Sequence, residues 1–240
     1  MAIETTEAIV LNAIKYGDTS LIVRCFTKSV GLKTYMIRGV LNSKRGKIKP
    51  AYFQPITQVL LTANHNNKGN LNSLREVQVV HPYKTIYASV VKQTIVLFLS
   101  EVLSGIIQEE EQNNPLYNYL HTAFIWLDTH ANISNFHLLF LLNLSKYLGF
   151  YPDITQQEKM GFNLLEGNFT NSTHEKLIVS GKELILFKRL LGINFDAIEH
   201  VSFNKFERQK VLRMIIRYFE LHLDGFKQPK SLDVLETVFS

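Results

Sequence analysis

The sequence predicts an α+β protein in which a small five-stranded domain precedes an all-helical one. Along residues 1–80 apolar and polar side chains alternate with a period of two, which is typical of strands, whereas beyond His81 the period is about 3.6, which is typical of helices. The charge changes at the same point: residues 1–80 hold 11 Lys and Arg against 4 Asp and Glu, and residues 81–240 hold 15 against 17. We therefore expect two domains, 1–80 and 81–240.

Five short antiparallel strands are expected in the first domain. They cover residues 7–14, 20–26, 32–38, 56–62 and 71–80. The connection between the third and fourth strands is rich in glycine and lysine and is closed by Pro50. Five strands of this length with such a connection favour a small barrel, most often the oligonucleotide-binding (OB) fold. An SH3-like barrel is the nearest alternative.

Helix starts and stops in the second domain are marked by capping residues. We expect helices at residues 86–106, 114–128, 135–148 and 231–239, and two more that begin after Ser180 and Asn204. Asn114 next to Pro115 combines a side-chain acceptor at the N-cap with a proline at the first helical position. The two later helices begin with capping-box pairs, Ser180 with Glu183 and Asn204 with Glu207.

An irregular insertion interrupts the helical pattern at about residues 151–179. Within it, residues 162–169 alternate around Glu166-Gly167-Asn168, which favours a small hairpin. We expect packing of apolar side chains to hold this hairpin together, with Phe162, Leu164 and Phe169 as its core.

A long basic stretch in the first domain is the main functional signal. Between Thr19 and Arg75 the chain contains no Asp or Glu, but it contains Arg24, Lys28, Lys33, Arg38, Lys44, Arg45, Lys47, Lys49, Lys68 and Arg75. A concentrated positive field favours a polyanionic partner, and nucleic acid is the first candidate because phosphate binding releases its counterions. A solubilising basic face and a membrane-surface patch are the alternatives.

Aromatic residues flank the most basic part of this stretch. Tyr35, Tyr52 and Phe53 stand on either side of it. Flat rings beside cations are typical of single-strand binding, in which bases stack while phosphates contact Lys and Arg. The same rings could instead fill the barrel core.

No catalytic arrangement is visible, so we expect a protein that is not an enzyme and needs no cofactor. The segment from Gly39 to Lys47 resembles a phosphate loop, but six residues rather than four separate its glycines, and Ile48 stands where a magnesium-binding hydroxyl belongs. The eight histidines form no zinc motif, and Cys25 is the only cysteine. The chain also lacks a signal peptide pattern and a membrane-spanning apolar run, which favours the cytoplasm.

Several landmarks together resemble the RecO family of recombination mediators. They are Tyr16-Gly17-Asp18 with Ser20-Leu21-Ile22-Val23, then Phe26-Thr27, Gly31, Arg38-Gly39 and Phe53-Gln54-Pro55, and finally Leu148-Gly149-Phe150-Tyr151-Pro152-Asp153. Their order and spacing cover nearly the whole chain, and they fit a barrel followed by helices.

The resemblance implies a DNA repair and recombination mediator. Such a protein binds single-stranded and double-stranded DNA, anneals complementary strands, and acts with RecR to load RecA on DNA coated with single-strand-binding protein, whose C-terminal tail it grips. It would be cytoplasmic and nucleoid-associated. The alternative is a non-catalytic protein–protein adaptor whose basic face is only solubilising.

The resemblance also implies which residues bind DNA, with two departures from the family pattern. The resemblance assigns DNA binding to Arg38, to Lys44, Arg45, Lys47 and Lys49 in the loop after it, and to Lys33 nearby; the basic stretch and its flanking rings add Arg24 and Tyr35 to the predicted DNA-binding residues. Many relatives have a basic residue where Leu41 stands. In this chain the positive charge must therefore come from Lys44, Arg45, Lys47 and Lys49. Many relatives also carry four zinc-binding cysteines after Pro152-Asp153, whereas this chain has none there, which predicts a hairpin without zinc.

Overall fold

The computed structural model describes residues 2–42, 47–65 and 71–239. The chain divides into two compact units, Met1–Thr129 and His130–Ser240. The change from strands to helices falls after His81, as the periodicity predicts, whereas the first two helices belong to the same compact unit as the strands. None of the helices in the described part of the chain is both long and apolar enough to cross a membrane.

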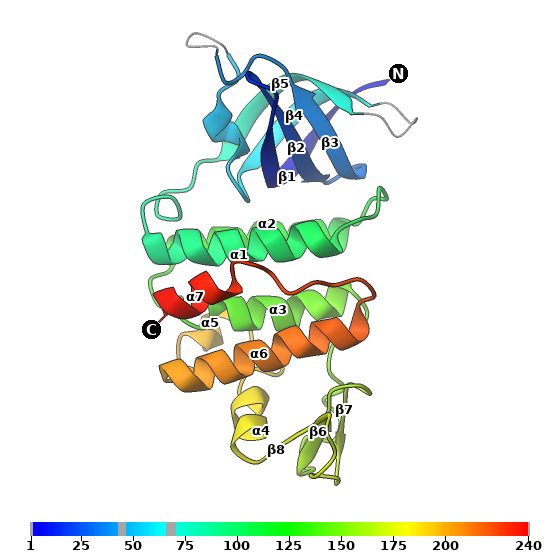
Figure 1. Ribbon diagram of the computed structural model, residues 1–240, viewed down its shortest axis with the longest axis vertical. Coiled ribbons are helices and arrows are strands. Elements are labelled where there is room, and N and C mark those ends of the chain that lie inside the picture. The colour runs from blue at the N-terminus through cyan, green and yellow to red at the C-terminus, as the bar shows by residue number, and fades with distance from the viewer. Residues whose placement is uncertain (1, 43–46, 66–70, 240) are drawn as a thin grey trace. The chain divides into compact units, whose positions relative to one another are not determined.

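The first unit is built on a closed five-stranded barrel, which confirms the predicted fold (Figure 1). Its strands are β1 (Ala2–Tyr16), β2 (Ser20–Thr27), β3 (Gly31–Ile37), β4 (Gln58–His65) and β5 (Asn72–His81). They lie in the order β1-β2-β3-β5-β4, and β4 pairs with β1 to close the barrel. A register shift between Val10 and Asn12 marks a bulge in β1, which lets this long strand bend and pair with both β2 and β4.

One side of the barrel is closed by very little pairing. β3 and β5 run parallel, and only Tyr35 with Asn72 and Met36 with Ser73 are paired. The other four strand pairs are antiparallel and longer. The segment after β3 turns back across this side: Val40 and, in a short 3₁₀ helix η1 (Pro50–Phe53), Phe53 are buried in the barrel core.

Two helices, α1 (Val90–Ile106) and α2 (Asn114–Thr129), complete the first unit. α1 begins later than predicted, with Ser89 as its N-cap, because Asp128 holds the preceding segment in a turn by accepting hydrogen bonds from the backbone N–H groups of Lys84, Thr85 and Ile86. The hydroxyl of Ser100 in α1 donates to the carbonyl of Leu11 in β1.

The start of α2 differs from the prediction by one residue. The side chain of Asn113, not Asn114, accepts a hydrogen bond from the N–H of Leu116, at 3.1 Å. Pro115 then occupies the second helical position, where a backbone N–H would also lack an intrahelical partner. The proline signal was therefore sound, but it allowed either asparagine as the cap.

The second unit contains five helices and a small sheet among the described residues (Figure 1). These are α3 (Phe136–Tyr147), β6 (Gly161–Asn163), β7 (Asn168–Thr170), β8 (Ile178–Ser180), α4 (Gly181–Lys188), α5 (Phe195–Ile198), α6 (Lys205–His222) and α7 (Leu232–Val238). The predicted hairpin is confirmed as β6–β7, and β8 adds a third strand. Phe162, Leu164 and Phe169 are buried in it, and the rings of Phe162 and Phe169 meet edge to face.

Capping explains one predicted helix start and contradicts another. Asn204 and Glu207 form the predicted capping box at α6. Ser180 precedes α4, but its hydroxyl does not cap the helix; it donates to the carbonyl of Thr173, while Glu183 pairs with Lys210 of α6. α5 was not predicted, because four residues are too few to show a helical period.

Candidate nucleic-acid interface

A groove of about 720 Å³ lies on the weakly paired side of the barrel. It is lined by Met36, Ile37, Arg38, Ile48, Leu71, Asn72, Ser73 and Leu74. These residues come from the end of β3, the loop that follows it, and the start of β5. Because β3 and β5 are joined by only two residue pairs, the strands separate beyond them and leave the groove between their ends.

One exposed cation lines this groove, and three more are neighbours in sequence of residues that line it. Arg38 forms part of its wall, Lys47 and Lys49 flank the lining residue Ile48, and Arg75 follows Leu74 in β5; all four are exposed. Among the described residues, their side chains have no hydrogen-bond or ion-pair partner. Unpaired surface cations beside a concave surface are what a phosphate backbone requires.

Two of the predicted DNA-binding residues, Lys44 and Arg45, lie outside the described residues. They belong to the loop that carries Lys47 and Lys49. Their role in DNA binding stays a prediction.

Arg24 is engaged with a helix end instead of facing solvent freely. Its guanidinium donates to the carbonyls of Ser104 and Ile107, at 3.2 and 3.4 Å, and to the side-chain oxygen of Gln108. The last carbonyls of a helix lack intrahelical donors and carry partial negative charge, so an arginine there is stabilising. Arg24 thus serves the contact between β2 and α1.

Lys33 is also occupied within the first unit. Its ammonium pairs with the carboxylate of Glu110 at 2.5 Å, and its side chain is 13% exposed. The N–H of Leu32 donates to the carbonyl of Glu109, so the segment after α1 extends along the start of β3. Gly31 allows this approach, because a Cβ at this position would lie 2.3 Å from the carbonyl oxygen of Glu111.

Tyr35 lies in the barrel core, which is the alternative role that the sequence allowed for it. Its ring is 1% exposed and its hydroxyl bonds to Nε2 of His65, whose Nδ1 donates to Glu4. A hydrogen bond from Ser29 and the neighbouring His65 hold the pKa of Glu4 below its ordinary value. Tyr35 therefore supports the barrel by a buried polar chain and is not placed to stack on a base.

Phe53 and Tyr52 also face the interior. Phe53 is 4% exposed and Tyr52 is partly buried against the same core. The three rings that flank the basic loop in the sequence therefore anchor the loop to the barrel. Lys49 directly precedes the 3₁₀ helix that contains Tyr52 and Phe53.

Sequence reasoning missed two parts of this interface. Arg75 was counted in the basic stretch but was not assigned to the site, because the sequence does not show that its neighbour Leu74 lines a groove together with Arg38. The apolar lining of Met36, Leu71 and Leu74 was also missed, since a mixed pattern at strand ends gives no signal for a groove.

The described residues show no other reactive centre. No group of three or more His, Cys, Asp or Glu within residues 2–42, 47–65 and 71–239 could hold a metal ion. Cys25 is fully buried, and burial raises the pKa of its thiol to about 12, so it is a small core residue and not a nucleophile.

Comparison with known proteins identifies relatives along nearly the whole chain. Residues 1–83 match the family described as recombination protein O N terminal, and residues 88–233 match recombination protein O C terminal. Similar proteins, each named DNA repair protein RecO, include those of Flavobacterium johnsoniae (47% identity, 98% of both chains) and Christiangramia forsetii (44%, 98% of both). The protein of Bacteroides fragilis is 34% identical over 99% of both chains.

Proposed function

This chain belongs to the RecO family, and we propose that it acts in DNA repair and recombination by binding single-stranded and double-stranded DNA in the groove of its barrel. The relatives that align with this chain over 98% and 99% of their own length are named DNA repair protein RecO. The observation that supports the proposal most strongly is the set of exposed, unpaired cations around the groove: Arg38, Lys47, Lys49 and Arg75.

The proposed mechanism is charge neutralisation without chemistry. Two complementary strands repel each other through their phosphates, and cations on one surface lower that repulsion so that the strands can pair. No residue between Thr19 and Arg75 carries a negative charge that would oppose this. The protein is then a mediator that consumes no nucleotide.

The proposal includes protein partners that follow from the family. The chain would act with RecR to load RecA on single-stranded DNA, and would bind the C-terminal tail of single-strand-binding protein. Several cations of the second unit that could have contacted an acidic tail are already paired: Lys182 with Glu207, Lys210 with Glu183, Arg213 with Glu236, and Arg217 with Glu220. The lysine and arginine side chains of these pairs are all more than half exposed, and surface ion pairs contribute little to stability, so an exchange of partners would cost little.

Charge reversal at the groove tests the DNA-binding site. We expect Arg38→Glu with Lys47→Glu and Lys49→Glu to abolish annealing of complementary oligonucleotides and to weaken DNA binding at least tenfold at low salt. The matched control is Lys84→Glu with Lys176→Glu and Lys227→Glu, which makes the same change in net charge at exposed positions in other connecting segments of the chain. Equal loss in both variants would show that net charge, not the groove, drives binding.

Salt dependence gives an independent measurement. If each of the four described cations contacts a phosphate of single-stranded DNA, the log–log slope of affinity against salt is about −2.8, at about −0.7 per contact. Lys44 and Arg45 would bring it to about −4 by the same coefficient. A slope near zero, or no binding of a fluorescent oligonucleotide at low salt, would favour the adaptor alternative.

A further inference from the structure

The outer face of β1, β2 and β3 presents an apolar strip to solvent. In β2, Leu21, Val23 and Cys25 point into the core, so Ile22 points outward between them. Ile22 pairs with Ile14 of β1 on one side and with Met36 of β3 on the other. Met36 also lines the groove, so the strip continues into it.

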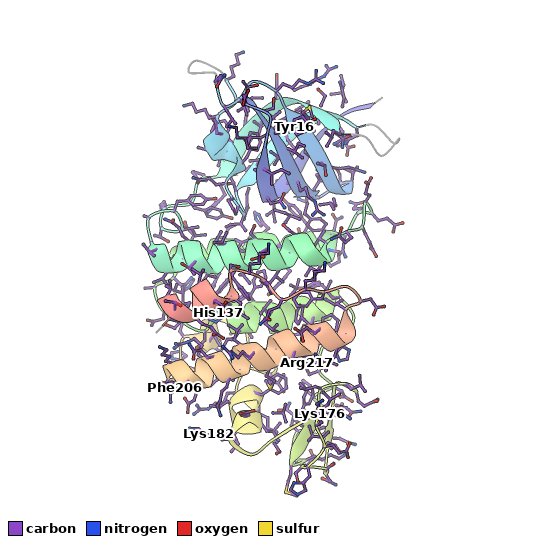
Figure 2. All side chains as sticks on the ribbon, viewed as in Figure 1. Tyr16, His137, Lys176, Lys182, Phe206 and Arg217 are labelled. Carbon is purple, nitrogen blue, oxygen red and sulfur yellow. The ribbon has the colours of Figure 1, made fainter. Side chains whose placement is uncertain are left out.

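Tyr16 ends this strip at the tip of the β1–β2 hairpin. It pairs with Ser20, and its ring is 54% exposed, while Ile14 is 56% exposed (Figure 2 labels Tyr16 on the barrel). The tyrosine hydroxyl has no hydrogen-bond partner within the described part of the chain. A large solvent-exposed ring beside other exposed apolar side chains is typical of a surface that binds a ligand or another macromolecule.

Arg38 is the first residue after β3, at the end of the barrel where Tyr16 pairs with Ser20. Leu21 pairs with Ile37, so the next residues toward this end of the barrel are Ser20 and Arg38. The N–H of Leu41 donates to the carbonyl of Thr19 at 2.9 Å, which holds the chain after Arg38 against the hairpin. Tyr16 and Arg38 are thus two strands apart, or about 10 Å between backbones, at about 4.8 Å per strand.

An exposed ring and an exposed guanidinium at this spacing suit an unpaired nucleotide. The base can lie on the ring of Tyr16 while the phosphate contacts Arg38, which directly follows β3 at this end of the barrel. Asp18 is the only carboxylate in the turn between β1 and β2, so phosphates are expected on the Arg38 side of the ring. Bases of a duplex are stacked on each other and cannot use this platform.

We propose that Tyr16 is a base-stacking residue for single-stranded DNA, and that the strip formed by Ile14, Tyr16, Ile22 and Met36 extends the DNA groove across the barrel face. This inference rests on the proposed function and adds a preference for single-stranded over double-stranded DNA. The groove cations bind phosphates of any DNA, whereas Tyr16 contributes only when bases are unpaired.

Substitution of Tyr16 in the full chain tests the inference. Tyr16→Ala is expected to weaken binding of a thymine oligonucleotide about 5- to 150-fold, the range for loss of one base–aromatic stack. Binding of a blunt hairpin duplex is expected to change less than twofold. Tyr16→Phe keeps the ring and should bind both ligands like the native chain. Phe206→Ala is the matched control, because Phe206 is a 71% exposed ring on α6 of the second unit.

Fluorescence provides a direct signature of stacking. Trp126 is the only tryptophan, so Tyr16→Trp in a Trp126→Phe background places one indole at the proposed site. We expect single-stranded DNA, but not the hairpin duplex, to quench it. Trp126→Phe alone, with Tyr16 retained, should bind DNA normally.

The possible results separate this inference from the proposed function. If charge reversal at the groove weakens binding but Tyr16→Ala does not, the stacking role is wrong and the groove stands. Equal weakening of both DNA ligands by Tyr16→Ala would also overturn stacking. If Tyr16→Ala leaves DNA binding intact and removes binding of a protein partner, the strip is a protein interface. If the native chain binds no DNA, the proposed function itself fails.

Discussion

The guanidinium of Arg24 donates a hydrogen bond to the backbone carbonyl of Ser104, with 3.2 Å between Nη1 and the oxygen. This contact joins β2 to the last turn of α1 across 80 residues of sequence. Arg24, one of the cations of the basic stretch, thus satisfies carbonyl groups at the C-terminal end of α1. The exposed basic surface of the barrel is correspondingly smaller and lies nearer to the groove.

Replacement of Arg24 should affect stability more than DNA binding. Arg24→Met keeps much of the side-chain stem but removes the hydrogen bonds to the helix end, so we expect unfolding in urea to become easier by about 1.5–3 kcal/mol. Arg75→Met is the control, because Arg75 is exposed and has no described partner; its stability should change by less than about 0.5 kcal/mol. For DNA affinity we expect the reverse order, with Arg75→Met binding DNA more weakly than Arg24→Met. That result would support the assignment of the groove as the DNA-binding site.

Gly31 should be intolerant of any side chain. Its φ is +65°, and an added Cβ would lie 2.3 Å from the Glu111 carbonyl oxygen, so Gly31→Ala must displace the segment after α1. We expect a loss of at least about 3 kcal/mol in a denaturant titration. Gly17→Ala has a similar φ of +59° and open space around it, so it should cost only about 1–2 kcal/mol. Similar losses for both would mean that backbone conformation, not close approach, decides the effect.

The acidic segment after α1 should compete with DNA for Lys33. Glu110→Gln removes the carboxylate that pairs with Lys33 and leaves that ammonium free to contact phosphate. We expect tighter binding of single-stranded DNA at low salt and a log–log salt slope steeper by about 0.7. Glu158→Gln makes the same charge change at an exposed position of the second unit and should leave the slope unchanged. An unaltered salt slope in Glu110→Gln would show that Lys33 does not contact DNA.

His137 should make the stability of the chain depend on pH. Burial, and to a lesser extent the charge of Arg208, lowers the pKa of His137 from 6.5 to about 3. Between these values the unfolded chain binds a proton that the folded chain does not, so stability falls as pH falls below 6.5. We expect unfolding free energies between pH 7 and 5 to show uptake of about one proton. His137→Leu should reduce that slope, whereas His174→Gln, at an exposed position, should not.

The elements that the sequence predicted well are those with strong local signals. Alternation of Leu21, Val23 and Cys25 located β2, and the Asn204–Glu207 capping box located α6, because each depends on neighbours in the chain. The four residues of α5 and the start of α1 at Val90 were not found. The first is too short to show a period, and the second depends on Asp128, which lies 38 residues further along the chain.

The candidate interface was predicted in composition but not in arrangement. A run of cations without carboxylates indicated a polyanion, and Arg38, Lys47 and Lys49 are exposed beside a groove. Alternation along a strand cannot reveal that a helix end covers an outward residue, which is the case for Arg24. It also cannot show which aromatic rings are exposed: Tyr35 is buried, whereas Tyr16, which the sequence offered only as a family landmark, is exposed.

The two-pair seam between β3 and β5 gives the barrel unequal stiffness around its circumference. Long antiparallel ladders hold β1 to β2 and to β4, so deformation concentrates where Tyr35 meets Asn72 and Met36 meets Ser73. A molecule bound between β3 and β5 would separate only these two residue pairs and would leave the antiparallel ladders intact. We therefore expect the barrel to open most easily along this seam, beside the exposed cations of the groove.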